Sequence, residues 1–148
     1  TGGSRAGNLP VKRHRNQQQD SPQPDQPLSS EQLQRAAEPG GGIKSGDIAL
    51  FRFDWDKRGG QLPYPTTEAL RWLVGQGIKL LGIDTPGLDI PGDRSLPNHH
   101  LLFENGIPLI ESLDHLDQVQ ESRVYLFAQP LPLADTDAVP LRVLAFEG

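Results

Sequence analysis

Cysteine and methionine are both absent from the 148 residues of the chain. The lack of cysteine excludes thiol catalysis, thiolate metal sites and a disulfide framework. The lack of methionine means that the sequence does not begin at its own start codon. We therefore expect Thr1 to follow a segment that was removed or never supplied, and the chain to be the C-terminal part of a longer protein.

Long apolar runs and a broad basic surface are also missing. No apolar run approaches the roughly 20 residues that cross a bilayer, and the N-terminus lacks the apolar core of a signal peptide. The net charge is -5, and the one basic cluster, residues 12–15, is more typical of a solvated tail than of a phosphate-binding surface. We expect a soluble, cytoplasmic protein that binds neither membranes nor nucleic acid.

Residues 1–28 are rich in glycine, glutamine and proline and hold almost no large apolar side chains. Such a segment buries too little apolar surface to offset the entropy that ordering costs. The sequence therefore predicts a flexible arm over residues 1–28, followed by one folded domain over residues 29–148.

Residues 29–148 show hydrophobic patterns that alternate between helical and strand periods, bounded by caps and turn residues. Ser29 and Gln32 have the spacing of a capping box, and Thr66 is a good N-cap. The expected helices are 30–38, 66–77 and 96–104, with a helical turn at 114–119; the expected strands are 47–53, 78–83, 107–110, 123–128 and 141–146. A helix that ends at Gly77 and leads directly into a strand indicates an α/β fold, with a mixed sheet and flanking helices.

His99 and Glu111 are the residues with the clearest chemical potential, on either side of an expected helix-to-strand turn. Glu111 interrupts an apolar strand, where a carboxylate is costly unless a cation or several donors compensate it. The pair could share a metal ion, or it could be a histidine at the core edge hydrogen-bonded to a carboxylate. His100 points about 100° away from His99 on a helix, so the two histidines do not easily bind one ion.

Other side chains have less specific patterns. Asp84 and Asp89 lie at and after the carboxyl end of an expected strand, where α/β proteins tend to place ligand sites, or they cap turns. Phe53, Trp55 and Tyr64 could line a pocket for an aromatic substrate, or they could belong to the core.

The run GIDTPGLDIPGDRSLPNHHLLFENGIPLIESLDHLDQV resembles the C-terminal half of the cyclase family, which includes bacterial kynurenine formamidases. The shared features are an Asp-Thr-Pro turn, a Pro-x-His on a helix, and a Glu in an apolar strand. The closing stretch YLFAQPLPLADTDAVPLRVLAF is similar to the family's last hairpin. The resemblance spans about residues 29–148 and implies a swivelling β/β/α fold that is incomplete in this chain.

The resemblance also implies roles for His99 and Glu111, as ligands of the second ion in a two-metal site of zinc or manganese. The implied reaction is hydrolysis of an amide such as N-formylkynurenine, an arylformamidase activity of tryptophan catabolism, by water activated near neutral pH. The relatives are commonly homodimers or larger assemblies.

The chain departs from the family in one respect, because it has no His-x-Gly-Thr-His-x-Asp-x-Pro-x-His motif, which supplies the other ligands and the catalytic histidine. We therefore expect no catalytic residue in this chain. Three interpretations stay open: an N-terminal half has been cut off, a second chain completes the site, or catalysis is lost and the chain is an interaction domain. A lactone or lactam hydrolase on the same fold is a further alternative.

Overall fold

The computed structural model describes residues 5–9, 27–55 and 61–148. Within them lies one mixed sheet of six strands in the order β4-β3-β2-β1-β5-β6. Strands β1 to β4 run parallel to one another, whereas β5 pairs antiparallel with both β1 and β6. The strands are β1 (Arg5–Leu9), β2 (Ile48–Phe51), β3 (Leu80–Ile83), β4 (Leu109–Ile110), β5 (Arg123–Pro130) and β6 (Leu141–Phe146).

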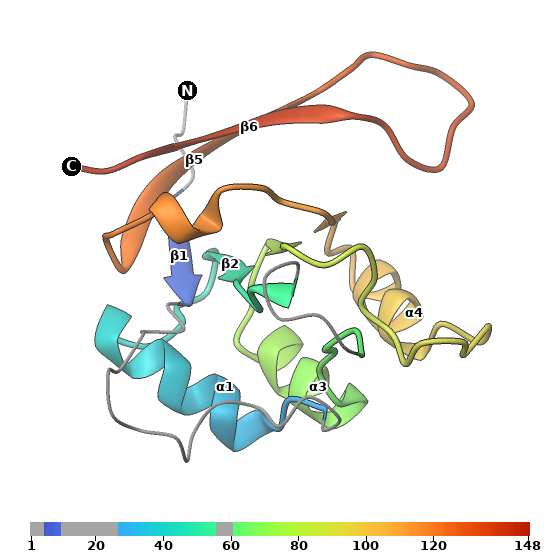
Figure 1. Ribbon diagram of the computed structural model, residues 1–148, viewed down its shortest axis with the longest axis horizontal. Coiled ribbons are helices and arrows are strands. Elements are labelled where there is room, and N and C mark those ends of the chain that lie inside the picture. The colour runs from blue at the N-terminus through green and yellow to red at the C-terminus, as the bar shows by residue number, and fades with distance from the viewer. Residues whose placement is uncertain (1–4, 10–26, 56–60) are drawn as a thin grey trace.

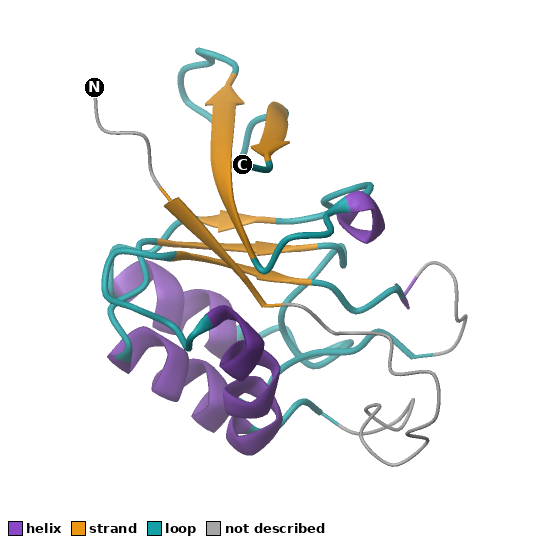
Figure 2. Ribbon diagram, turned by 90° about the vertical axis from the view of Figure 1, so that its left-hand side faces the viewer, coloured by secondary structure: helices purple, strands orange, loops and turns teal. Residues whose placement is uncertain are grey.

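Three α-helices cover one face of this sheet (Figure 2): α1 (Ser30–Ala37), α3 (Thr67–Gly75) and α4 (Pro97–Glu104). Two short 3-10 turns, η1 (Glu38–Gly40) and η2 (Leu116–Gln118), also lie in the described ranges. The hairpin of β5 and β6 extends away from the helices, across the top of Figure 1. The α/β class with a mixed sheet and flanking helices is thereby confirmed.

The helix starts follow from local chemistry. Ser29 forms the expected capping box with Gln32, and the Thr66 hydroxyl accepts a hydrogen bond from the Ala69 amide at the start of α3. Helix α4 has proline at its first position, which suits a helix start because the amide there has no partner. The expected helices and strands outside the N-terminal arm are confirmed, with shifts of a few residues at their ends.

The sheet has an apolar layer on each face, because successive side chains of β2 point to opposite sides. Ala49 and Phe51 pack with residues of α1, α3 and α4 in the main core, while Ile48 and Leu50 pack with Val124 in a smaller cluster. The strands β2 and β3 are therefore buried on both faces, as parallel strands usually are. Because both strands are packed on two faces, their ends hold the residues that follow them in fixed positions.

The expected flexible arm over residues 1–28 is wrong for Arg5–Leu9, which form strand β1 between β2 and β5. Composition failed here because pairing with a strand on each side outweighs the weak strand propensity of this segment. The folded region therefore begins before the expected boundary at residue 29. The rest of the expected arm, residues 1–4 and 10–26, lies outside the described residues.

No helix in the described ranges is both long and apolar enough to cross a membrane.

Candidate metal site at the carboxyl edge of the sheet

The parallel strands β2, β3 and β4 end at the same edge of the sheet, and a polar segment follows each of them. Arg52 and Asp54 follow β2, Asp84 follows β3, and Glu111 follows β4. The outer carboxyl edge of a parallel sheet is where α/β proteins bind ligands. These polar groups therefore occupy the position in the fold where a site is expected.

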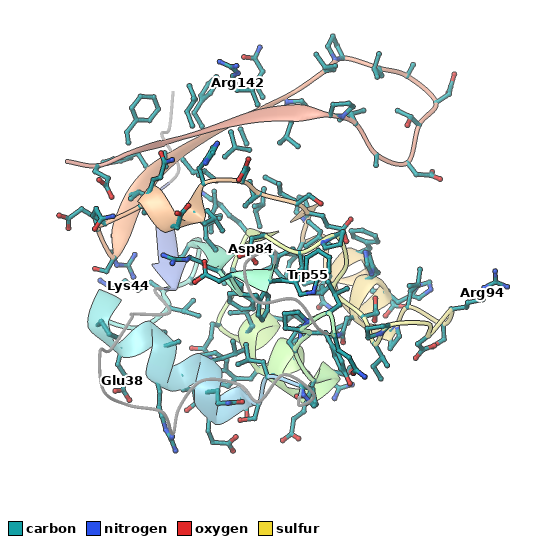
Figure 3. All side chains as sticks on the ribbon, in the orientation of Figure 1. Glu38, Lys44, Trp55, Asp84, Arg94 and Arg142 are labelled. Carbon is teal, nitrogen blue, oxygen red and sulfur yellow. The ribbon has the colours of Figure 1, made fainter. Side chains whose placement is uncertain are left out.

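Asp84 links two of these strand ends. Its carboxylate accepts hydrogen bonds from the backbone amides of Phe53 and Asp54, each at 2.9 Å. Burial raises the pKa of Asp84, and the backbone hydrogen bonds offset only part of this effect. Figure 3 shows Asp84 in the interior of the molecule, below the hairpin. Asp84 thus acts as a turn cap for the segment after β2, one of the two roles that its position allows.

His99 and Glu111 come together at this edge. His99 Nε2 lies 3.2 Å from Glu111 Oε1, and the two side chains are 21% and 35% exposed. His99 sits in the first turn of α4, and Glu111 directly follows β4. The ring of Phe103, one turn along α4, packs edge-on against the His99 imidazole with ring centroids 5.8 Å apart. The pair is therefore partly shielded and still open to solvent on one side.

The sequence suggested that Glu111 lies within an apolar strand, but the structure places it outside the strand and exposed. Strand β4 ends at Ile110, and the chain turns immediately, with Ser112 in a left-handed conformation (φ 55°). The Ser112 amide donates to the Thr85 carbonyl oxygen, which fixes this turn against the end of β3. Glu111 is an exposed residue at a strand end, so the cost of burying its charge is not an argument for a ligand role; its proximity to His99 is.

Asp89 and Asn98 form a buried polar cluster behind the histidine. Asp89 Oδ1 accepts a hydrogen bond from the Asn98 backbone amide at 2.6 Å, and Asp89 Oδ2 lies 2.5 Å from His99 Nδ1. The Asn98 side chain donates to the carbonyl oxygens of Pro65 and Leu88, both at 3.0 Å. Asp89 therefore caps α4 from the preceding loop and also contacts the ring. Sequence reasoning missed the contact with His99, because nothing in the spacing showed that the loop folds back onto the helix.

The expected substrate pocket is not assembled as a unit. Phe53 is buried in the main core and packs edge-to-face against Phe51 with centroids 6.1 Å apart, so it belongs to the core. Trp55 packs against the same core, and Tyr64 is half-buried, its carbonyl oxygen accepting a hydrogen bond from the Leu28 amide. A pocket role for Trp55 and Tyr64 stays a prediction.

The other histidines lie apart from this pair. His100 is exposed on α4, and His115 lies on the surface with its ring 3.4 Å from the Asp114 carboxylate. His14 is outside the described residues. Within the described parts of the chain, no three histidine, aspartate or glutamate side chains are placed so that they could hold an ion together.

The chemistry of the pair suits a divalent ion as part of a larger ligand set. An imidazole nitrogen and a carboxylate oxygen are ligands that both zinc and manganese accept. A tetrahedral ion with ligands at about 2.0–2.2 Å separates two of them by roughly 3.4 Å. The observed 3.2 Å between His99 Nε2 and Glu111 Oε1 is close to this value.

Comparison with known proteins places these observations in context. A family model described as "Putative cyclase" matches residues 10–90. Curated relatives include kynurenine formamidases from Bordetella pertussis, 38% identical over 80 residues, and from Bacillus cytotoxicus, 36% identical over 83 residues. These matches cover 54% and 56% of the chain but only 38% and 39% of the relatives. The aligned part of this chain thus spans well under half of each relative's length.

Several solved structures are similar to this chain over most of its length. One, described as a predicted metal-dependent hydrolase from Bacillus stearothermophilus, is 26% identical with a TM-score of 0.72, covering 96% of this chain and 62% of its own. Another, an isatin hydrolase bound to a product analogue, is 28% identical with a TM-score of 0.71, covering 82% and 53%. The family model ends at residue 90, before His99, so the structural likeness extends the comparison toward the pair.

Proposed function

Because this chain belongs to the cyclase family, we propose that it is part of a metal-dependent hydrolase in which His99 and Glu111 bind a divalent ion. The observation that carries the proposal is the 3.2 Å separation of His99 Nε2 and Glu111 Oε1 at the carboxyl edge of the parallel strands. Two solved structures, described as a predicted and as a potential metal-dependent hydrolase, are similar to this chain with TM-scores of 0.72 and 0.68. Their names support the class of reaction.

The two side chains supply part of the ligand set. The described residues contain no group of three ligand side chains, and we propose that a longer chain or a second chain supplies the remaining ligands. The complete site holds two ions, zinc or manganese, and the enzyme works as a homo-oligomer. In this arrangement His99 and Glu111 fix one ion at an edge that is open to solvent, where a small substrate can reach it.

The proposed substrate is an amide of the N-formylkynurenine type, because the curated relatives at 36–38% identity are named kynurenine formamidases. A bound divalent ion supplies polarisation of the scissile carbonyl group and activation of water at neutral pH. The chain's own contribution is to orient the ligands: α4 holds the imidazole, and the turn after β4 holds the carboxylate.

A cyclic amide or lactone is the second candidate substrate. The similarity to an isatin hydrolase, with a TM-score of 0.71, favours it, since isatin is a lactam. Hydrolysis of the formamide and of the lactam both attack the acyl carbon of an amide whose nitrogen is bonded to an aromatic ring, so the same ligands serve either reaction. The substrates differ in shape, which is set by loops around the site.

A chain without activity is the third candidate. The described residues include too few ligands to run the reaction alone, so an interaction domain that keeps the fold is consistent with the geometry. The presence or absence of tightly bound metal separates this candidate from the first two.

The test uses the protein as purified from its source, together with any chain that co-purifies. His99→Ala and Glu111→Ala should each lower the hydrolysis of N-formylkynurenine by at least about 100-fold, more than the loss of an outer partner of a ligand typically costs. His100→Ala is the matched control, because His100 is the next residue on the same helix and is exposed. It should leave the rate within about twofold.

Each alternative has its own outcome. Faster hydrolysis of isatin than of the formamide by the wild type would favour the lactam candidate. In that case His99→Ala and Glu111→Ala should each lower isatin hydrolysis by the same factor. A wild-type protein with no bound zinc or manganese and no activity on either substrate would favour the interaction domain and contradict the hydrolase.

A further inference from the structure

Asp89 is a buried carboxylate that serves two groups at once. It is 6% exposed. Its Oδ1 atom accepts from the Asn98 amide at 2.6 Å, and its Oδ2 atom accepts from the His99 amide at 3.3 Å and lies 2.5 Å from His99 Nδ1. The same side chain therefore holds the first turn of α4 and the imidazole ring that this turn carries.

The ring contact exceeds what a helix cap requires. Leu96 occupies the N-cap position with φ 47° and provides no side-chain cap, so Asp89 replaces it from the loop. The backbone amides of Asn98 and His99 would be satisfied without any contact to the ring. The approach of Oδ2 to Nδ1 has a separate effect, on the imidazole itself.

A carboxylate is only an acceptor, so it favours a proton on the ring nitrogen that faces it. Both ring nitrogens of His99 face a carboxylate, and the shorter contact, 2.5 Å from Nδ1 to Asp89 against 3.2 Å from Nε2 to Glu111, favours the proton on Nδ1. In the neutral ring the lone pair then lies on Nε2, the atom that a metal ion between His99 and Glu111 would contact. Metal-binding histidines commonly donate their other N–H to a carboxylate, which fixes the tautomer and the orientation of the ring. Phe103 packs against the ring and limits its rotation further.

We propose that Asp89 is a positioning residue that fixes the tautomer and orientation of His99, so that Nε2 is free to bind a metal ion. This inference rests on the proposed function, because it assigns the role to the histidine named there. Asp93 offers a contrast, since it lies in the same loop and its Oδ1 atom accepts hydrogen bonds from the amide and the hydroxyl of Ser95.

The decisive variant is Asp89→Asn. An asparagine keeps one oxygen that can accept from the Asn98 amide, so α4 retains its cap. Its amide nitrogen then faces His99 Nδ1 as a donor, which favours the proton on Nε2 and removes the lone pair there. The variant should therefore fold and bind metal poorly. Asp93→Asn is the matched control, because it changes an aspartate of the same loop whose hydrogen bonds go to Ser95, and asparagine keeps the oxygen that accepts them.

Three readouts are measured on both variants and on the wild type. Long-range ¹H–¹⁵N NMR of the metal-free chain at pH 8 should show His99 Nδ1 protonated in the wild type and in Asp93→Asn, and unprotonated in Asp89→Asn. Competition with a chelator should show zinc or manganese affinity reduced about 10- to 100-fold in Asp89→Asn and unchanged in Asp93→Asn. Far-ultraviolet circular dichroism checks that each variant is folded.

The wild-type spectrum tests the inference even if a variant fails to fold, because an unprotonated Nδ1 in the metal-free wild type overturns it. Metal affinity in a folded Asp89→Asn variant within twofold of the wild type also overturns it. If the wild type binds no ion at all, the proposed function fails, and the tautomer readout alone decides whether Asp89 positions the ring.

Discussion

The carboxyl edge of the parallel strands and the β5–β6 hairpin place their side chains in opposite ways. At the edge, polar groups are buried: Asp89 and Asn98 are 6% and 2% exposed. On the hairpin, large apolar groups face solvent, and Phe127 is 51% exposed. Buried polar groups are costly unless hydrogen bonds satisfy them. The Asp89 carboxylate and the Asn98 side-chain nitrogen are held by backbone amides and carbonyls, whereas Asn98 Oδ1 has no hydrogen-bond partner within the described residues. Hydrogen bonds at the edge hold polar side chains in fixed positions, whereas backbone pairing between β5 and β6 holds the hairpin.

The hairpin shows how pairing alone stabilises a region. Tyr125 faces Phe146 and Phe127 faces Leu144 across the two strands, so these four exposed side chains share one face. Cross-strand pairs of this kind contribute roughly 0.2–1 kcal/mol each. Stability should therefore be distributed unevenly, with large effects in the core near the edge and small effects on the hairpin.

The largest expected effect is in the core. Leu81→Ala removes a fully buried side chain from β3 and should lower the free energy of unfolding by about 3 kcal/mol. Phe127→Ala, on the exposed face of the hairpin, should lower it by less than about 1 kcal/mol. Urea denaturation of both variants measures the difference. Equal losses in the two variants would show that the exposed face is packed against something in solution.

A somewhat smaller effect is expected at the buried asparagine. Asn98→Ala leaves the carbonyl oxygens of Pro65 and Leu88 without the donors that they now have, and should cost about 2 kcal/mol. Asn105→Ala, at the C-cap of the same helix, is the control, since its side chain donates to the Leu101 carbonyl oxygen at an exposed position. It should cost less than about 1 kcal/mol. Thermal unfolding compares the two, and a reversed order would contradict the role of the buried cluster.

The smallest expected effect concerns the ion pair that ties β5 to the loop before β2. Burial raises the pKa of Asp47, but hydrogen bonds from Arg123 and from the Lys44 amide outweigh it and leave the pKa below its ordinary value. A lowered pKa in the folded state contributes stability that is present above the unfolded value of about 3.9 and is lost as the pH falls through the folded value.

Asp47→Asn should therefore reduce stability by about 1–2 kcal/mol at pH 7 and have less effect at pH 3. Asp137→Asn, on the exposed loop between β5 and β6, is the control and should change the unfolding free energy at pH 7 by less than about 0.5 kcal/mol. Unfolding free energies measured from pH 2 to pH 7 test this. A constant penalty for Asp47→Asn across that range would contradict the assigned ion pair.

Local signals predicted most of the fold. The capping box at Ser29, the N-cap at Thr66 and the proline that opens α4 are set by neighbouring residues, so the helix starts could be read from the sequence. Strand β1 could not, because its place in the sheet depends on partners far along the chain, such as Ile48 and Val124.

The candidate site could likewise be predicted from the sequence only in part. The resemblance to the cyclase family singled out His99 and Glu111, and the structure places their side chains within 3.2 Å of each other, although their role as ligands stays a prediction. The contact of Asp89 with His99 joins residues ten apart through an irregular loop, which no periodicity describes. The exposed position of Glu111 depends on the turn at Ser112, which strand propensity did not reveal.

The central claim is that His99 and Glu111 share a divalent ion, and anomalous diffraction tests it most directly. Crystals of the chain, with any chain that co-purifies, are soaked in zinc or manganese and measured at the absorption edge of the metal. The account predicts an anomalous peak within bonding distance of both His99 Nε2 and the Glu111 carboxylate, about 2.0–2.2 Å from each for zinc. A map with no peak there, or with peaks only at surface groups such as His115, would contradict it.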